Sequence, residues 1–201
     1  MRPLNIIFIF LLSSTLLLAG CTTTSTQPPP QNQAVSWDSR VQNLSRIQAW
    51  NLKGSIAIRS RQEANSASLQ WQQSQRNYTI SLFGPLGTQS YVLTGKPGQV
   101  DLEMSDGKKF SATTPEILLA EQTGWRLPVS NLYYWVRGLP VPGVPAQKQF
   151  DAYHHLTQLS QQGWNIQYLN YVSINNIDIP NKISLNNPQL NVKIVIRQWE
   201  F

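Results

Sequence analysis

Apolar and polar residues alternate in short runs along most of this chain, and this alternation narrows the possible folds more than any other feature. A period of two places successive side chains on opposite faces of a β-strand. Turn signals such as Lys96-Pro97-Gly98 and Asp106-Gly107 separate the runs. Short strands at this spacing predict an antiparallel sheet with one buried face. Before residue 105 the inward positions would be Leu52, Ile56 and Ile58; Ala67, Leu69 and Trp71; Tyr78, Ile80 and Leu82; Tyr91 and Leu93; and Val100, Leu102 and Met104.

Helical signals interrupt the strands. Three helices are expected, at residues 37–48, 115–123 and 131–137. Their expected N-cap residues are Ser36, then Thr113 or Thr114, and then Ser130. Gly124 and Gly138 follow the last two, as is typical of helix ends. After an irregular apolar loop at 139–145, strands are expected to resume at 153–160, 163–171, 182–186 and 190–199. We find no internal repeat, so the sequence predicts a single domain.

The N-terminal segment is typical of an export signal. Arg2 precedes an apolar stretch from 6 to 18, which is shorter than the roughly 20 residues that a membrane-spanning helix needs. The stretch closes in Leu18-Ala19-Gly20-Cys21, which resembles the bacterial lipobox and contains the only cysteine of the chain. The motif implies cleavage before Cys21 and a diacylglyceryl thioether with an acylated amine on that residue, and two or more acyl chains anchor a protein stably. The alternative is an ordinary secretory signal beside a chance cysteine.

The lipobox sets the expected organisation of the chain. Residues 1–20 would be a signal peptide, 21–36 the lipidated cysteine with a flexible tether rich in Thr, Gln and Pro, and 37–201 one folded domain. Thr22 stands where an Asp commonly signals inner-membrane retention in enterobacterial lipoproteins. We therefore expect a protein that is lipid-anchored in the outer membrane of a Gram-negative bacterium and faces the periplasm.

Composition limits the partners and the chemistry. Loss of Arg2 lowers the formal charge from +6 to +5, and the remaining basic residues are scattered rather than gathered in a nucleic-acid-binding arm. The excess suits an anionic lipid surface or an acidic partner, or is only a solvated surface. The ten acidic residues form no catalytic or metal-binding motif. His154 and His155 would point to opposite faces of a strand. No catalytic residue, metal or cofactor is expected, and no enzyme.

Tryptophan is the unusual component of the composition. Trp37, Trp71, Trp135 and Trp164 fall on four different predicted elements, each on the face expected to point inward. Each is most simply a core residue, yet each aromatic side chain buries about 150–250 Å². A hollow lined by these four would suit acyl chains. A filled core is the alternative.

A second unusual feature is the turn Gly84-Pro85-Leu86-Gly87. Proline at its second position and glycine at its fourth favour a turn, but a hairpin tip normally carries polar residues where Leu86 stands. Either this leucine folds back onto the sheet, or it forms an exposed apolar finger that contacts a membrane or another protein's cavity.

Five stretches follow one another in a recognisable order and spacing: the helix from Trp37 to Leu44, Trp71-Gln72-Gln73, Pro85-Leu86-Gly87, the stretch from Leu132 through Trp135 to Gly138-Leu139-Pro140, and the C-terminal run to Trp199. Through them most of the mature chain resembles the LolB family of outer-membrane lipoprotein receptors. It implies a mainly β fold with α: an unclosed antiparallel β-barrel, or curved sheet, covered by short helices around an apolar cavity.

The same resemblance implies a function. A protein of this kind accepts acylated lipoproteins from a LolA-type periplasmic carrier and inserts them into the outer membrane, with no cofactor, and it is expected to be a monomer. Leu86 would act in releasing the client into the membrane. Two other hypotheses stay open: a lipid-anchored envelope scaffold with a filled core, and a hydrolase with convergent polar groups in a cleft.

Overall fold

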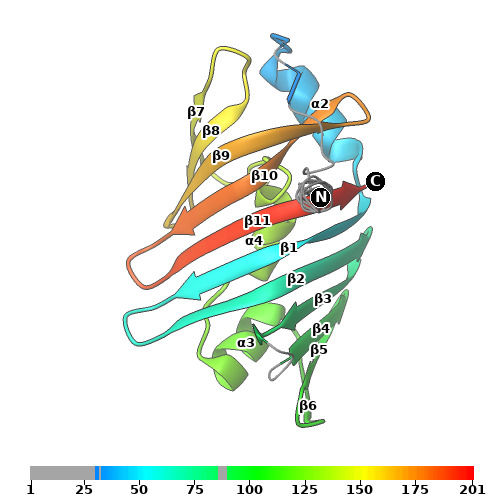
Figure 1. Ribbon diagram of the computed structural model, residues 1–201, viewed down its shortest axis with the longest axis vertical. Helices are drawn as coiled ribbons and strands as arrows, with labels where there is room; N and C mark the ends of the chain where they lie inside the picture. The colour runs from blue at the N-terminus through cyan, green and yellow to red at the C-terminus, as the bar shows by residue number, and fades with distance from the viewer. Residues whose placement is uncertain (1–29, 32, 86–89) are drawn as a thin grey trace, which may run out of the picture.

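One curved antiparallel sheet organises the molecule (Figure 1). The computed structural model describes residues 30–31, 33–85 and 90–201. In these residues eleven strands pair in the order β6-β5-β4-β3-β2-β1-β11-β10-β9-β8-β7, so that β6 and β7 form two separate edges. The predicted unclosed, curved sheet is therefore confirmed. The strands are β1 Ala49–Arg59, β2 Ala64–Ser74, β3 Asn77–Phe83, β4 Ser90–Lys96, β5 Gln99–Met104, β6 Lys109–Ala112, β7 Gln147–Phe150, β8 Leu156–Gln161, β9 Trp164–Ile174, β10 Ile177–Asn186 and β11 Asn191–Glu200.

The first and last strands meet at the centre of the sheet. β1 pairs with β2 on one side and with β11 on the other, with Leu52 opposite Trp199 and Ile56 opposite Ile194. The register shifts between Lys53 and Gly54, where the two backbones approach closely. A Cβ on Gly54 would lie 2.0 Å from the carbonyl oxygen of Val195, so this position has room only for glycine.

Three helices accompany the sheet in the described residues: α2 Trp37–Arg46, α3 Pro115–Thr123 and α4 Val129–Trp135. Figure 1 shows α3 and α4 behind the sheet, while α2 lies at the end where β9 turns into β10. Ser36 caps α2 and Thr114 caps α3, as predicted, and Gly124 ends α3 with φ of +73°. None of these helices is long and apolar enough to cross a membrane.

The start of the third helix differs from the prediction. α4 begins at Val129 directly after Pro128, whose ring presets a helical φ, and no side chain caps it. Ser130 lies within its first turn rather than at the N-cap. The Ser130 amide donates instead to Oε1 of Glu116 at 2.8 Å, so a side chain of α3 takes the capping role for α4.

The predicted strand at 153–160 was also wrong at its start. Residues 151–155 form a turn in which His154 has φ of +60°, and β8 begins only at Leu156. β10 begins five residues before the predicted 182 and contains Pro180, beside which its register with β9 shifts. The short edge strands β6 and β7 were not predicted.

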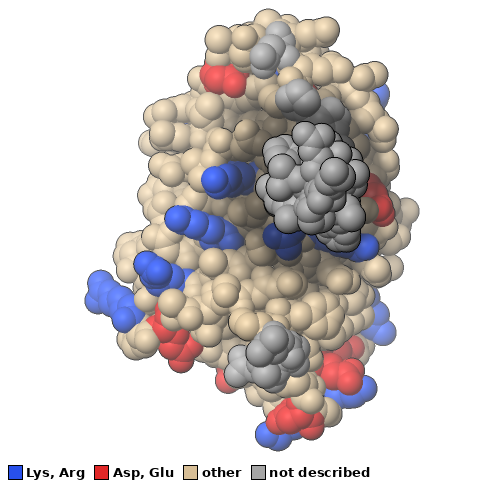
Figure 2. Space-filling model, in the orientation of Figure 1, with Lys and Arg blue, Asp and Glu red and all other residues tan. Residues whose placement is uncertain are grey.

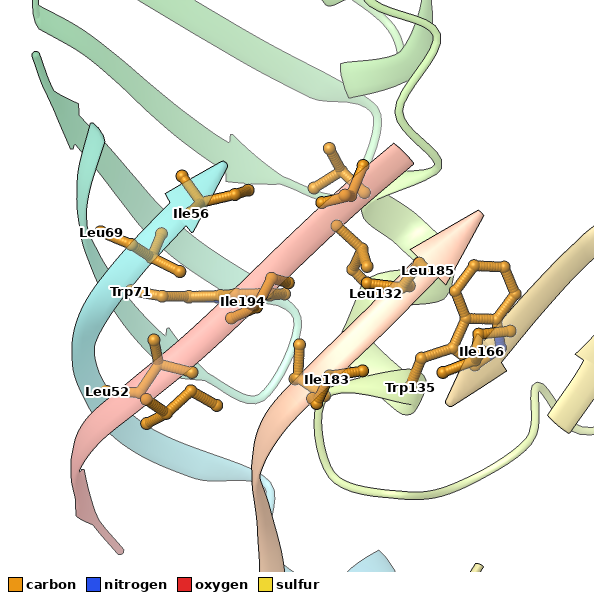
Figure 3. Close-up of a cluster of buried hydrophobic side chains, with 14 of the residues drawn as sticks. Leu52, Ile56, Leu69, Trp71, Leu132, Trp135, Ile166, Ile183, Leu185 and Ile194 are labelled. Atoms are coloured by element: carbon orange, nitrogen blue, oxygen red, sulfur yellow. The ribbon is translucent and has the colours of Figure 1, made fainter. Parts of the chain in front are cut away.

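The core lies between the sheet and helices α3 and α4. Figure 3 shows Leu132 and Trp135 of α4 pointing toward the inward side chains of the central strands. Trp135, Ile183 and Ile194 are each no more than 1% exposed. The outward face of the same strands is polar, and Figure 2 shows Lys and Arg side chains gathered over β1, β10 and β11. Alternation with the buried positions assigns this basic face to the exposed residues Lys53, Arg59, Lys182, Lys193 and Arg197.

Candidate functional site

Apolar side chains enclose a small cavity between the sheet and the segment from α3 to α4. Ile56 and Trp71 line it from the central strands, Leu93 from β4, and Leu119 and Leu132 from the two helices. Its volume is about 50 Å³. A water molecule takes about 30 Å³ of liquid volume, so this inner cavity would hold one or two waters. An acyl chain can enter only if the lining side chains, or the helices that carry them, move apart.

A much larger space lies directly outside this inner cavity. The outer groove has a volume of about 590 Å³ and runs between the turn end of the β1–β2 hairpin, Pro85 and the end of α3. Four residues line both spaces and therefore form the partition between them: Ile56, Leu82, Tyr91 and Trp125. The rings of Tyr91 and Trp125 pack with centroids 5.8 Å apart. These two side chains are therefore in contact within the partition.

The structure places the four predicted tryptophans in three different environments. Trp71 lines the inner cavity, and its indole N–H donates to Oε1 of Gln73 at 2.8 Å. Trp135 packs against Trp164 with centroids 6.3 Å apart, beneath β8 and β9 and away from the residues that line the cavity. Trp37 is half-buried on α2. Its ring lies 4.9 Å from that of Phe150 and does not reach the cavity lining.

Sequence reasoning missed Trp125, the tryptophan of the partition. It follows Gly124 in the link between α3 and α4, where no periodic pattern marks an inward face. The only available signal was a large aromatic residue directly after a helix-ending glycine. Pro85 lies at the rim of the outer groove. Leu86 and Gly87 of the predicted insertion loop, and the predicted lipidation site Cys21, lie outside the described residues.

Comparison with known proteins identifies the family of this chain. A family profile described as "Outer membrane lipoprotein LolB" matches residues 48–199. The chain belongs to the LolB family. Outer-membrane lipoprotein LolB of Coxiella burnetii is 41% identical over 165 residues, which cover 82% of this chain and 78% of that one. Its Pseudomonas aeruginosa counterpart is 41% identical over 170 residues, covering 85% and 83%.

Solved structures resemble the fold at low sequence identity. A DUF1329 family protein from Desulfovibrio piger superposes with a TM-score of 0.52 at 6% identity, covering 81% of this chain and 90% of that one. An outer membrane lipoprotein-sorting protein domain from Vibrio parahaemolyticus gives 0.51 at 7% identity, covering 81% and 91%. At these identities the likeness shows the fold alone.

A buried cation joins two helices of this LolB-family domain. Arg137, which is 2% exposed, donates to the carbonyl oxygens of Leu44 at 3.2 Å, Ile47 at 2.7 Å and Tyr133 at 3.0 Å. Its guanidinium also lies over the ring of Trp50, 4.9 Å from the centroid. Burial lowers the pKa of Arg137 from its ordinary value, although nearby Tyr133 opposes this shift. Arg137 thus satisfies the carbonyl groups at the C-terminal end of α2, where a helix favours positive charge.

A second polar cluster contains His155, one of the two histidines of the chain. The ring of His155 bonds Asp151 through Nδ1 at 2.8 Å and Asp178 through Nε2 at 2.9 Å, while Arg40 of α2 also pairs with Asp178 at 3.4 Å. His155 is therefore a satisfied structural residue, and the exposed His154 beside it takes no part. Within the described ranges, no group of three or more His, Cys, Asp or Glu side chains could hold a metal ion.

Proposed function

We propose that this protein is a lipid-anchored receptor that accepts acylated lipoproteins from a LolA-type periplasmic carrier and inserts them into the outer membrane. In this proposal residues 1–20 are removed, Cys21 carries the lipid, and residues 21–36 tether a monomeric domain to the periplasmic side of the membrane. A single observation carries the receptor function: an apolar cavity lies directly inside an open groove, in a chain of the LolB family.

Acyl chains suit the inner cavity because aliphatic and aromatic side chains make up its lining. Removing apolar surface from water gains about 25 cal/mol per Å², so a long chain could be bound without a cofactor or nucleotide. Trp71 supplies aromatic surface in the cavity itself. We propose supporting roles in the surrounding core for Trp37, Trp135 and Trp164. The client then passes from carrier to receptor to bilayer because each site binds the acyl chains better than the one before.

Transfer from the carrier tests the proposal directly. A purified LolA-type carrier is loaded with an acylated lipoprotein and mixed with liposomes that hold the mature lipidated protein, without nucleotide. We expect the client to leave the carrier and to appear in the liposomes, with a transient complex that can be pulled down on the receptor. If the client stays on the carrier while circular dichroism shows a folded receptor, the scaffold hypothesis takes its place.

The turn at residues 84–87 supplies a second test. We propose that Pro85, Leu86 and Gly87 form the membrane-insertion loop, with Leu86 as the apolar group that contacts lipid. Leu86→Glu should leave folding and client acceptance intact but reduce client insertion into liposomes several-fold, because a charge resists entry into the bilayer. Gln89→Glu adds the same charge three residues further along the chain and serves as the control. Loss of client acceptance in Leu86→Glu would show instead that this leucine is structural.

A further inference from the structure

The two spaces of the site differ in chemistry although they share a wall. The inner cavity is lined by apolar side chains. The outer groove is lined by apolar residues, which include the partition, and also by polar residues. A ligand that spans both must therefore be an amphiphile whose apolar part points inward past the rings of Tyr91 and Trp125.

The polar part of the groove lining offers neutral hydrogen-bonding groups. Asn65 lies on the inward face of β2, and Gln122 and Thr123 come from the end of α3. The side chain of Gln122 makes no hydrogen bond to other described residues, so it is available to a ligand. Amide and hydroxyl groups both donate and accept, which matches the carbonyl groups of esters and amides.

The charge of the groove further limits the kinds of ligand that it can bind. Its only charged lining residue among those described is Glu63, whose Oε2 accepts from Nδ2 of Asn65 at 3.2 Å. Neither Lys nor Arg is found among the described residues that line it. Phosphate binding normally recruits Arg or Lys, and a carboxylate repels an anion. The groove is therefore suited to an uncharged polar group and opposes the phosphate of a phospholipid.

We propose that the outer groove binds the polar end of an acylated lipoprotein, the glyceryl ester and amide groups beside its lipidated cysteine, while the acyl chains lie in the inner cavity. This inference rests on the proposed receptor function and adds a second subsite to it. Discrimination against phospholipid follows from the same geometry, because the two kinds of lipid share acyl chains and differ at the polar end.

Photolabelling of the full lipidated protein in vesicles tests the two subsites. Two triacylated cysteinyl pentapeptides are used, one with a diazirine at the glyceryl group and the other with a diazirine at the far end of an acyl chain. We expect the glyceryl probe to label residues 63–66 or 122–123, and the chain-end probe to label residues of the inner cavity such as Leu93 and Leu102. Labelling of the cavity by the glyceryl probe would overturn the subsite while leaving the receptor function standing. If neither probe labels the protein, both the proposed subsite and the proposed receptor function are contradicted.

A variant makes the test quantitative. Gln122→Leu should lower labelling by the glyceryl probe about fivefold, the loss expected for one hydrogen bond, and should leave labelling by the chain-end probe unchanged. Gln72→Leu, on the exposed outer face of β2, is the matched control and should change neither. A phosphatidylglycerol that carries the same headgroup diazirine should label the groove weakly, and more strongly in Glu63→Lys. Equal labelling of the groove by phospholipid and lipopeptide in the parent protein would contradict the proposed selectivity.

Discussion

At the scale of single residues, Arg137 shows how the domain tolerates a buried charge. Its three donated hydrogen bonds end on backbone carbonyl groups, and its planar group lies against the rings of Trp50 and Tyr133. An arginine suits this position better than a lysine because its rigid fork donates in several directions at once. It connects the end of α2 to the segment that follows α4.

Replacement of this side chain should therefore be costly. Arg137→Ala is expected to lower the free energy of unfolding by about 3 kcal/mol, because the carbonyl groups of Leu44 and Ile47 lose their donors in a buried site. Urea denaturation followed by fluorescence measures the change. Arg126→Ala, at an exposed position, should stay within about 0.5 kcal/mol of the parent. Equal losses in the two variants would show that the Arg137 contacts contribute little.

Asp151 gives the domain an acid-sensitive contact. Burial alone would raise its pKa, but hydrogen bonds from the His155 ring and from the amides of His155 and Tyr153 outweigh this and lower the pKa. Stability from a carboxyl with a lowered pKa is complete above its unfolded value of about 3.9 and is lost as pH falls through the folded value.

Acid titration of stability should reveal this contribution. Between about pH 5 and pH 2 the parent protein should lose more unfolding free energy than Asp151→Asn, which has no carboxyl to protonate. The slope against pH is the readout, since the variant also changes hydrogen bonds at every pH. Parallel slopes would place the acid sensitivity elsewhere in the chain.

Residue types alone identified only part of the site. Trp71 was found because a strict alternation puts it on the buried face of β2. Alternation and helical spacing also predicted inward faces for Trp135 and Trp164, and both are buried. A periodic pattern predicts which side chains of an element point into the core, but not which residues of other elements they meet there. It therefore could not distinguish the tryptophans that line the cavity from those in the filled part of the core. Trp125 lies in a link without periodicity, and its pairing with Tyr91 depends on how α3 is placed.

At the scale of elements, Gly54 lies where the backbones of β1 and β11 leave no room for a side chain. A Cβ there would meet the carbonyl oxygen of Val195 at 2.0 Å and the Cα of Ile196 at 2.9 Å, and both are backbone atoms that cannot rotate away. Gly54→Ala should therefore reduce stability by about 3 kcal/mol, at the upper end of the usual cost of overpacking. Thermal denaturation provides the measurement, with Ser55→Ala as the control from the same strand. An unchanged melting temperature in Gly54→Ala would mean that β1 and β11 can separate at little cost.

Elements with strong local signals were predicted well. Alternation located the long strands, and the caps Ser36 and Thr114 located two helix starts. The edge strands β6 and β7 have four residues each, too few to establish a period. The start of α4 depends on a hydrogen bond from Ser130 to Glu116 of another helix, which no local sequence pattern reports.

At the scale of the whole molecule, the sheet and its helical cover should differ in stability. β1 and β11 have paired neighbours on both sides. By contrast, α3 has its main contacts with β5, β6 and α4, and its Ile117 is 46% exposed. Segments with fewer buried contacts open locally at lower free energy. The segment from α3 to α4 is thus the part that could move to enlarge the inner cavity.

Hydrogen exchange measures this difference. Amides in residues 115–135 should exchange at least about tenfold faster than those in β1 and β11, and binding of a triacylated lipopeptide should alter exchange there more than in the central strands. Mass spectrometry of peptic fragments gives both values in one experiment. Uniform protection across the domain would mean that the cavity cannot open without disturbing the sheet.

The sheet order has a consequence for how the protein is made. Because the first strand needs the last as its neighbour, a chain that crosses the inner membrane N-terminus first cannot complete its sheet until its final residues have emerged. Contacts between such distant segments also form slowly. During that interval the free side of β1 is an unpaired edge of the kind that attracts other strands. Late closure makes a prematurely terminated product a candidate for aggregation or proteolysis in the periplasm.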